Sequence, residues 1–208
     1  RTAMNAFLSG YLREENVRIR DSKIAFTLSP HEKGGSSSQR CSWEGVQKKY
    51  GDFELRAPKG EIRKEETVGV VGENGIGKTT FVKLLANVDK IDSGEITSQI
   101  KVSYKPQYLN SESEELVMNL LKDAKKYEHQ IIKPLNIEPL FMKQLNQLSG
   151  GQLQRVSIAY CLSQNTDLFL LDEPSAYLDV EQRLRVSKVI RDFIAERGKS
   201  ALVVDHDL

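Results

Sequence analysis

The chain has 208 residues, of which 39% are hydrophobic and 28% are charged, as in an ordinary soluble globular domain. Lys and Arg total 30 against 29 Asp and Glu, so the net charge of +1 gives no overall attraction to nucleic acid or to a membrane surface. The sequence contains neither a run of about 18 apolar residues nor the pattern of a signal peptide, so we expect the chain not to cross a membrane unaided. Cys41 and Cys161 lie far apart without metal-ligand spacing, which favours a reduced, cytoplasmic protein.

Because residue 1 is not Met and the chain stops directly after Leu208, we expect a piece of a longer protein.

The first half of the chain contains two kinds of strand pattern. Residues 16–27 alternate apolar and polar types, which predicts half-buried strands, and the Gly- and Ser-rich residues 31–39 predict a flexible loop. The short β-branched run of residues 68–71 predicts a buried strand, and residues 78–86 predict the helix after it. A strand, a Gly-rich turn and a helix therefore follow one another in this order.

The middle of the chain is predicted to be mostly helical. Residues 114–129 carry a helical pattern, and we expect its apolar side to pack into the core. This side consists of Leu116, Leu120, Leu121 and Ala124. A further helix is predicted to begin near Gly151, and the apolar residues 168–171 predict the strand after it.

The C-terminal part continues the alternation of helices and strands. Asp179 can cap a helix, with Gln182 in capping-box position and Gly198 just past the helix end. Residues 201–204 predict a last strand. This alternation predicts a mostly parallel sheet with helices on both faces and binding sites at the carboxyl ends of its strands. The apolar stripe of the capped helix is predicted to consist of Leu184, Val186, Val189, Ile190, Phe193 and Ile194.

A phosphate-binding loop is predicted between the strand of residues 68–71 and the helix after it. Residues 72–79, GENGIGKT, match the pattern G-x-x-x-x-G-K-[ST]. In such a loop, main-chain N–H groups and the helix N-terminus surround phosphates, the lysine reaches the terminal phosphates, and the Ser/Thr hydroxyl binds Mg²⁺. A chance glycine turn is the alternative. The predicted binding residues are Gly72, Glu73, Asn74, Gly75, Ile76, Gly77, Lys78, Thr79 and Thr80.

Two adjacent acids end the apolar strand of residues 168–171. Asp172 can hold a magnesium ion, directly or through water, and Glu173 is placed to orient and polarise an attacking water molecule. The alternative is a solvated strand end. The phosphate-binding loop about a hundred residues upstream favours the catalytic interpretation.

A second anion cradle is predicted at residues 148–152, LSGGQ, directly before a helix. The Ser hydroxyl, the glycine amides and the helix dipole can all face an anion there. One nucleotide does not need two cradles. The sequence LSGGQ, together with the phosphate-binding loop, LLDEP, SAYLD and a histidine after the last strand, resembles the ABC (ATP-binding cassette) ATPases.

This resemblance implies a P-loop NTPase fold of the ABC ATPase type, with a mostly parallel core sheet, an N-terminal antiparallel β subdomain and a helical lobe. Residues 1–208 would form a single nucleotide-binding domain for ATP and Mg²⁺. Its ATP-binding core would comprise residues 1–108 and 164–208, and its helical lobe residues 109–163.

Several site residues are implied by the resemblance alone. In ABC ATPases two domains face each other head to tail. The LSGGQ sequence, here called the signature, would therefore bind the nucleotide of the partner domain through Ser149, Gly150, Gly151 and Gln152. Gln107, in YKPQYL, would sense Mg²⁺ and the attacking water, and His206 would contact the γ-phosphate. Asp179 would connect the two sites. Tyr50, which lies 28 residues before Lys78, would stack on adenine, with Phe53 as the alternative.

The connecting segments resemble one branch of the ABC family in particular. FLSGYLREENVRIR, VSYKPQYL, IIKPLNIEPL and LLDEPSAYLDVEQRLRVSKVIR are similar to the second nucleotide-binding domain of the RNase L inhibitor family, the class E ABC proteins. Gln152 and Asn87 depart from this family's usual Glu and Gly.

The family implies a cytoplasmic twin-cassette protein with an N-terminal iron–sulfur domain, which closes on ATP and splits ribosomes into subunits. Its expected partners are a second ABC domain and, through the full-length protein, the small ribosomal subunit, with no membrane and no sequence-specific nucleic acid. The ATPase subunit of a membrane transporter and a non-hydrolysing scaffold gated by nucleotide are the rival interpretations.

Overall fold

The computed structural model describes residues 11–12, 17–18, 39–98, 101–105 and 112–205. The chain divides into two compact units, Arg1–Ser36 and Ser37–Leu208. In the first unit, β1 (Tyr11–Leu12) pairs antiparallel with β2 (Val17–Arg18). The rest of the strands predicted over residues 16–27 lies outside the described residues, and so does the loop predicted over residues 31–39 except for its last residue, which opens β3.

A parallel sheet forms the centre of the second unit. Its strand order is β6 (Thr67–Val71), β10 (Ser200–Asp205), β9 (Leu168–Asp172) and β8 (Val102–Lys105), and all three pairings are parallel. Every residue of β9 is buried, as expected for a strand covered on both faces. The carboxyl ends of β8, β9 and β10 meet at one edge of the sheet.

An antiparallel sheet confirms the predicted β subdomain. Its long strand β3 (Gln39–Tyr50) pairs with β4 (Phe53–Ala57), β5 (Gly60–Arg63) and β7 (Ser93–Ser98). β3 and β4 form a hairpin in which Tyr50 lies opposite Phe53.

Three longer helices flank the parallel sheet, namely α2 (Lys78–Leu85), α4 (Gly150–Ser163) and α5 (Val180–Glu196). Asp179 caps α5 as predicted, because its carboxylate accepts a hydrogen bond from the Gln182 N–H at 2.8 Å. The predicted apolar stripe of α5 is buried except for Leu184, which is 37% exposed. Leu184 was wrongly included, because a residue two positions from Val186 lies about 200° around the helix from it.

The continuous helix predicted over residues 114–129 was wrong. The segment instead contains the single turn α3 (Val117–Leu120), the 3₁₀ helix η1 (Lys122–Tyr127) and the π-helical turn η2 (Glu128–Ile132). The 3₁₀ turns η3 (Glu138–Leu140) and η4 (Leu145–Gln147) follow. The N–H groups of Val117 and Met118 donate to the carbonyls of Lys143 and Phe141, and this pairing with a distant segment replaces the hydrogen bonds of an earlier helical turn.

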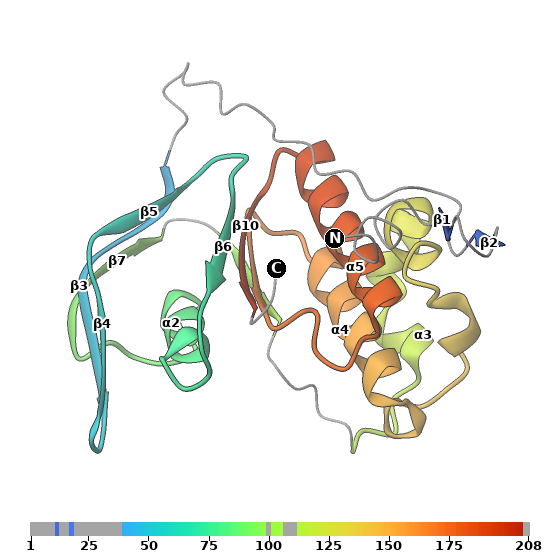
Figure 1. The fold of residues 1–208 in the computed structure, drawn as a ribbon, viewed down its shortest axis with the longest axis horizontal. Coiled ribbons are helices and arrows are strands. Elements are labelled where there is room, and N and C mark those ends of the chain that lie inside the picture. The colour runs from blue at the N-terminus through green and yellow to red at the C-terminus, as the bar shows by residue number, and fades with distance from the viewer. Residues whose placement is uncertain (1–10, 13–16, 19–38, 99–100, 106–111, 206–208) are drawn as a thin grey trace. The chain divides into compact units, whose positions relative to one another are not determined.

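Two hydrophobic clusters cover the two faces of the parallel sheet. Side chains alternate along β9, so Leu168 and Leu170 pack with α2 and the antiparallel sheet, while Phe169 and Leu171 pack with α4, α5 and residues 117–145. Figure 1 shows α2 and the antiparallel strands on one side of β6 and β10, with α4 and α5 on the other. This arrangement confirms the prediction of helices on both faces.

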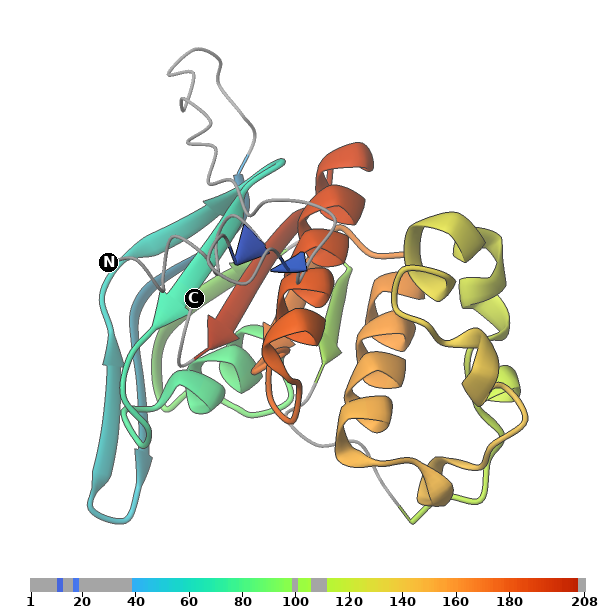
Figure 2. The ribbon, with the colours of Figure 1, turned by 45° about the vertical axis from the view of Figure 1, so that its right-hand side comes forward.

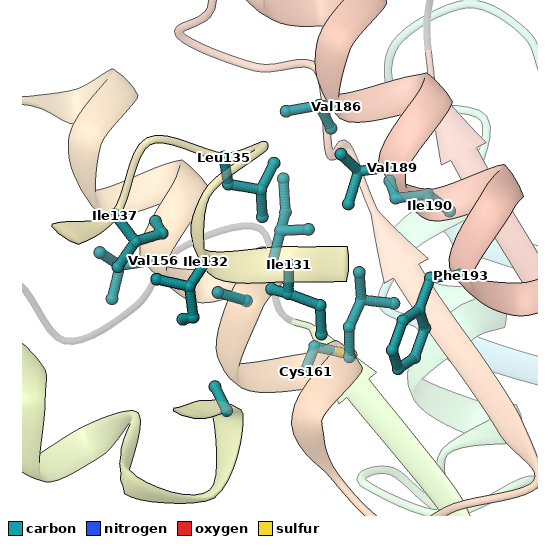
Figure 3. Packing of buried hydrophobic residues seen from close by; sticks show 14 of the residues in the cluster. Ile131, Ile132, Leu135, Ile137, Val156, Cys161, Val186, Val189, Ile190 and Phe193 are labelled. Atoms are coloured by element: carbon teal, nitrogen blue, oxygen red, sulfur yellow. The ribbon is translucent and has the colours of Figure 1, made fainter. Parts of the chain in front are cut away.

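The larger cluster joins the segmented region to α4 and α5. Figure 2 shows residues 117–147 beside α4, on the side away from the parallel sheet. In Figure 3, Ile131 and Ile132 lie between Val156 of α4 and Phe193 of α5, with Cys161 of α4 below Ile131. Leu121 and Ala124 are fully buried in this cluster, which confirms that part of the predicted core.

Both cysteines are buried and free. Burial raises the pKa of the Cys41 thiol to about 11, and it raises the pKa of the Cys161 thiol to about 11 as well. Both side chains are therefore neutral core residues at ordinary pH.

Candidate active site

The phosphate-binding loop joins the end of β6 to the start of α2, as predicted. Gly77 is the N-cap of α2 and adopts a left-handed backbone with φ +101°. A Cβ atom there would lie 2.8 Å from Cζ of Phe53 and 3.0 Å from Cδ1 of Leu55. Only glycine therefore fits both the backbone conformation and the space.

Lys78 opens α2 and is only 7% exposed. Its Nζ donates hydrogen bonds to the main-chain carbonyls of Gly72 at 2.5 Å and Glu73 at 2.7 Å. The ammonium group is thus held against the loop itself, beside the N–H groups at the start of the helix. A positive charge and a helix N-terminus at one place favour the binding of phosphate.

A pocket of about 480 Å³ opens over this loop. Besides the loop, one aromatic residue and one acid contribute to it. The lining residues are Phe53, Asn74, Gly75, Gly77, Lys78, Thr79, Thr80 and Glu173.

Tyr50, the aromatic residue predicted for adenine, is not among the residues that line this pocket. Its side chain is 46% exposed, and its hydroxyl group donates a hydrogen bond to Asp89. Phe53, the alternative, lines the pocket, and its ring fills the space that a side chain at position 77 would need. The geometry therefore favours Phe53 over Tyr50.

Asp172 ends β9 and is completely buried. Its Oδ1 accepts a hydrogen bond from Oγ1 of Thr79 at 3.1 Å, and its Oδ2 lies 3.5 Å from the Tyr104 hydroxyl group. Burial raises the pKa of Asp172, while the hydrogen bond from Thr79 lowers it. Burial of the Tyr104 hydroxyl group, together with the negative charge of Asp172, raises the pKa of Tyr104.

The oxygen atoms of Thr79 and Asp172 suit a magnesium ion, because hard cations prefer oxygen ligands. Within the described ranges, no three His, Cys, Asp or Glu side chains gather as a metal site. A cation held here would therefore depend on Thr79, Asp172 and the oxygen atoms of a bound phosphate.

Glu173 lines the pocket and is 9% exposed. Its backbone is left-handed, with φ +47°, although it is not a glycine. Its N–H donates to the Val204 carbonyl at 2.8 Å, and its carbonyl accepts from Nε2 of Gln154 at 2.5 Å. Glu173 thus stands on a tightly constrained turn that leads away from β9.

Sequence reasoning missed three polar residues around the acid pair, namely Tyr104, Lys105 and Gln154. Lys105 is 1% exposed and donates from Nζ to the Asp172 carbonyl at 2.9 Å. Burial lowers the pKa of Lys105 to about 8, against the opposing effect of the Asp172 charge. Lys105 lies two residues before the predicted site residue Gln107, which was the available signal, whereas Gln154 lies inside a helix and gave no signal of its own.

The signature residues form a regular helix start. Ser149 is the N-cap of α4, and its hydroxyl group accepts from the Gln152 N–H at 3.4 Å. Oε1 of Gln152 accepts from the Ser149 N–H at 3.2 Å, which completes a capping box. A Cβ atom on Gly150 would lie 3.3 Å from Cγ of Tyr177. The residues that line the pocket above the phosphate-binding loop include none of Ser149, Gly150, Gly151 and Gln152.

Two predicted site residues, Gln107 and His206, lie outside the described residues. Asp179, the third residue assigned by resemblance, caps α5 and is exposed. The hydrogen bond from the Gln182 N–H is the main reason why its pKa is lowered.

Comparison with known proteins agrees with this geometry. The family model described as "ABC transporter" matches residues 55–176, which is more than half of the chain. An uncharacterised ABC transporter ATP-binding protein of Methanocaldococcus jannaschii is 48% identical over 100% of this chain and 36% of its own length. ABC transporter E family member 1 of Arabidopsis thaliana is 40% identical, again over 100% of this chain and 36% of its own length. The chain thus spans about a third of the length of these relatives.

Solved structures give the same result. A structure described as "RNase-L Inhibitor" is 46% identical, covers 99% of this chain and 41% of its own chain, and has a TM-score of 0.89. The archaeal ribosome recycling factor aABCE1, solved with the ribosomal stalk protein aP1, is 46% identical, with a TM-score of 0.88 over 98% of this chain and 41% of its own. Among the described residues, no helix has the length and apolar character needed to cross a membrane. The chain belongs to the ABC family of ATPases, in the class E branch that contains the RNase L inhibitor.

Proposed function

We propose that the pocket above the phosphate-binding loop binds ATP with Mg²⁺ and hydrolyses the terminal phosphate. Thr79 and Asp172 would hold the ion, whose charge would balance that of the phosphates. Lys78 and the N–H groups of the loop would bind the phosphate oxygens. Glu173 would orient the attacking water and accept its proton. The observation that carries this proposal is the 3.1 Å hydrogen bond between Thr79 and Asp172, because it joins the loop to the acid pair.

Three further roles belong to the same proposal. Phe53 would stack on adenine in place of Tyr50, because it is the aromatic residue on the pocket wall. Gln107, two residues beyond the end of β8, would sense the ion and the attacking water. His206, directly after β10, would contact the γ-phosphate.

The complete site would be formed with a second ABC domain bound head to tail. The signature residues would then close over the partner's nucleotide, with the start of α4 directed at its γ-phosphate. The separation of these residues from the chain's own pocket supports this arrangement. Asp179 would lie at the interface between the two domains, since it caps α5 in an exposed position.

The parent protein would be a cytoplasmic ribosome recycling factor that carries this chain as the second of two cassettes. The similarity to aABCE1 over 98% of this chain supports this assignment. ATP-driven closure of the two cassettes would act on the small ribosomal subunit. We also propose that this cassette consists of an ATP-binding core, residues 1–108 and 164–208, and a helical lobe, residues 109–163.

The Glu173→Gln substitution in the parent protein tests both parts of the proposal. Loss of the general base is expected to slow phosphate release from this cassette by roughly 10²- to 10⁴-fold, with ATP binding retained. The other cassette is kept inactive so that the release measured comes from this one. Cosedimentation with the small ribosomal subunit should persist with ATP and the slow variant, because binding precedes hydrolysis.

Glu181→Gln is the matched control, because Glu181 is an exposed acid in the first turn of α5. It should release phosphate at the rate of the unchanged protein. Unchanged phosphate release in Glu173→Gln would refute the catalytic assignment. Membrane association of the parent, without binding to the ribosomal subunit, would refute the recycling assignment and favour a transporter.

A further inference from the structure

The backbone of Glu173 is held in a conformation that its residue type disfavours. A non-glycine residue at φ +47° persists only where the surrounding structure stabilises it, and such positions gather at active sites. The direction of the Glu173 carboxylate therefore depends on whatever fixes the two peptide groups beside it.

Hydrogen bonds hold both of these peptide groups. The Asp172–Glu173 peptide accepts from Lys105 Nζ at 2.9 Å and donates to the Val204 carbonyl at 2.8 Å. The Glu173–Pro174 peptide accepts from Nε2 of Gln154 at 2.5 Å. Lys105 and Gln154 are 1% and 4% exposed, so water competes little for these bonds.

Gln154 differs from the other two partners because it comes from a helix and not from the parallel sheet. It lies in α4, five residues after Ser149, which caps the same helix. An α-helix is stiff over this length, so a displacement of its N-terminus carries Gln154 with it. The Gln154 side chain therefore joins the signature end of α4 to the carbonyl group of Glu173.

We propose that Gln154 is a positioning residue that sets the direction of the Glu173 carboxylate and couples it to the signature residues of the same chain. This inference rests on the proposed function. When the signature binds a partner's nucleotide, the position of α4 is fixed. The hydrogen bond from Gln154 then fixes the direction of the Glu173 carboxylate in the pocket of its own chain. One cassette thereby responds to occupancy of the other site.

The Gln154→Met substitution in the parent protein, with the other cassette made inactive, tests the positioning role. Methionine keeps the length and most of the volume of the side chain but cannot donate a hydrogen bond. We expect kcat to fall about 10- to 100-fold because the base is misplaced, with the KM for ATP unchanged. Gln164→Met is the matched control, because Gln164 also donates from Nε2 to a main-chain carbonyl, at the other end of the same helix.

The measurement is made below the thermal transition of both variants, which circular dichroism establishes. An unchanged kcat in Gln154→Met, with only a lower Tm, would show a purely structural hydrogen bond and overturn the proposal. An equal fall of kcat in Gln164→Met would overturn it as well.

A double-mutant cycle tests the coupling. Ser149 does not line the pocket of its own chain, so any effect of Ser149→Ala on phosphate release from that pocket must be transmitted. With the other cassette inactive, Ser149→Ala should slow phosphate release more when Gln154 is present than when it is replaced by Met. Equal effects in both backgrounds would refute the coupling. If the cassette without substitutions releases no phosphate, the proposed function fails. If it releases phosphate and the Gln154→Met variant releases phosphate at the same rate, only this inference fails.

Discussion

At the scale of single residues, the two acids after β9 occupy different environments. Asp172 is fully buried, and both of its carboxylate oxygens face hydroxyl groups, those of Thr79 and Tyr104. Glu173 lines the pocket from a turn that leaves the strand. One acid is thus fixed to the phosphate-binding loop, and the other faces the space where a reaction would take place. This division matches the separate roles proposed for them.

The Phe53→Ala substitution should weaken ATP binding by roughly 10-fold, and Tyr50→Ala should change it by less than about 2-fold. Stacking of an aromatic ring on a base contributes about 1–3 kcal/mol, and about 1.4 kcal/mol corresponds to a 10-fold change. Isothermal titration calorimetry measures the affinities.

Phe53→Leu serves as the control for lost packing, since Phe53 also fills the space above Gly77. It should bind ATP about as weakly as Phe53→Ala. A larger loss of affinity in Tyr50→Ala than in Phe53→Ala would return the stacking role to Tyr50.

The candidate site residues that sequence reasoning predicted, and that the structure brings together, belong to contiguous motifs. The phosphate-binding loop and the acid pair could be identified because their chemistry requires fixed neighbours in the chain. Phe53 and Tyr50 could not be ranked, because they lie opposite each other in the β3–β4 hairpin and only tertiary packing, which places Phe53 beside Gly77 of the loop, separates them. Gln154 could not be found at all, because its partner, the carbonyl group of Glu173, is set by tertiary packing.

At the scale of elements, the end of α2 explains a departure from the family pattern. Asn87 stands where Gly is usual, and its φ is +55°. The Asn87 N–H donates to the Leu84 carbonyl at 3.1 Å, and the Val88 N–H donates to the Lys83 carbonyl at 3.0 Å. These two bonds form the Schellman motif, which needs a left-handed residue after the C-cap. Asn is the common substitute for Gly there, so the family's usual residue and this one serve the same turn.

The Asn87→Ala substitution should lower the free energy of unfolding by about 1 kcal/mol, because a left-handed backbone is more costly for Ala than for Asn. Asn87→Gly should leave the free energy unchanged or raise it slightly. Urea denaturation followed by circular dichroism measures both. Equal stability of the Ala and Gly variants would mean that the left-handed turn does not limit stability here.

The elements that were predicted well have their reasons within the local sequence. β9 is a short apolar run, and α5 combines a cap with an apolar stripe. Residues 114–129 also carry a helical pattern, but their backbone bends at Leu121 and Tyr127, with φ of −99° and −112°. Hydrogen bonds to residues 141–143 anchor the start of this segment, and an apolar pattern cannot reveal such distant partners.

At the scale of the whole second unit, the parallel sheet separates two hydrophobic clusters and presents its polar edge to the site. Lys105, Asp172 and Asp205 lie at the carboxyl ends of β8, β9 and β10. Ligands of open α/β sheets bind at such an edge. The pocket at this edge is lined without the signature residues of the same chain. Of the two anion cradles predicted from the sequence, only the phosphate-binding loop therefore lines this pocket.

The isolated chain should bind ATP but release phosphate at least about 100-fold more slowly than the parent protein. The missing signature would remove hydrogen-bond donors that face the transition state, and loss of even one such donor costs roughly 10²- to 10³-fold. Phosphate release measured at low chain concentration tests this, with Glu173→Gln as the background. A dilute chain that matches the parent, independent of concentration, would show that no partner domain is required.

Trp43 of β3, the only tryptophan of the chain, lies at the junction of the antiparallel sheet and the helix of the phosphate-binding loop. Its ring makes a T-shaped contact with Phe81 of α2, with centroids 5.1 Å apart, and a Cβ atom at position 60 would lie only 2.3 Å from the ring, so that position takes a glycine. A shift of α2 on nucleotide entry would change the surroundings of the indole. The intrinsic fluorescence of this chain therefore reports on that helix without any added label.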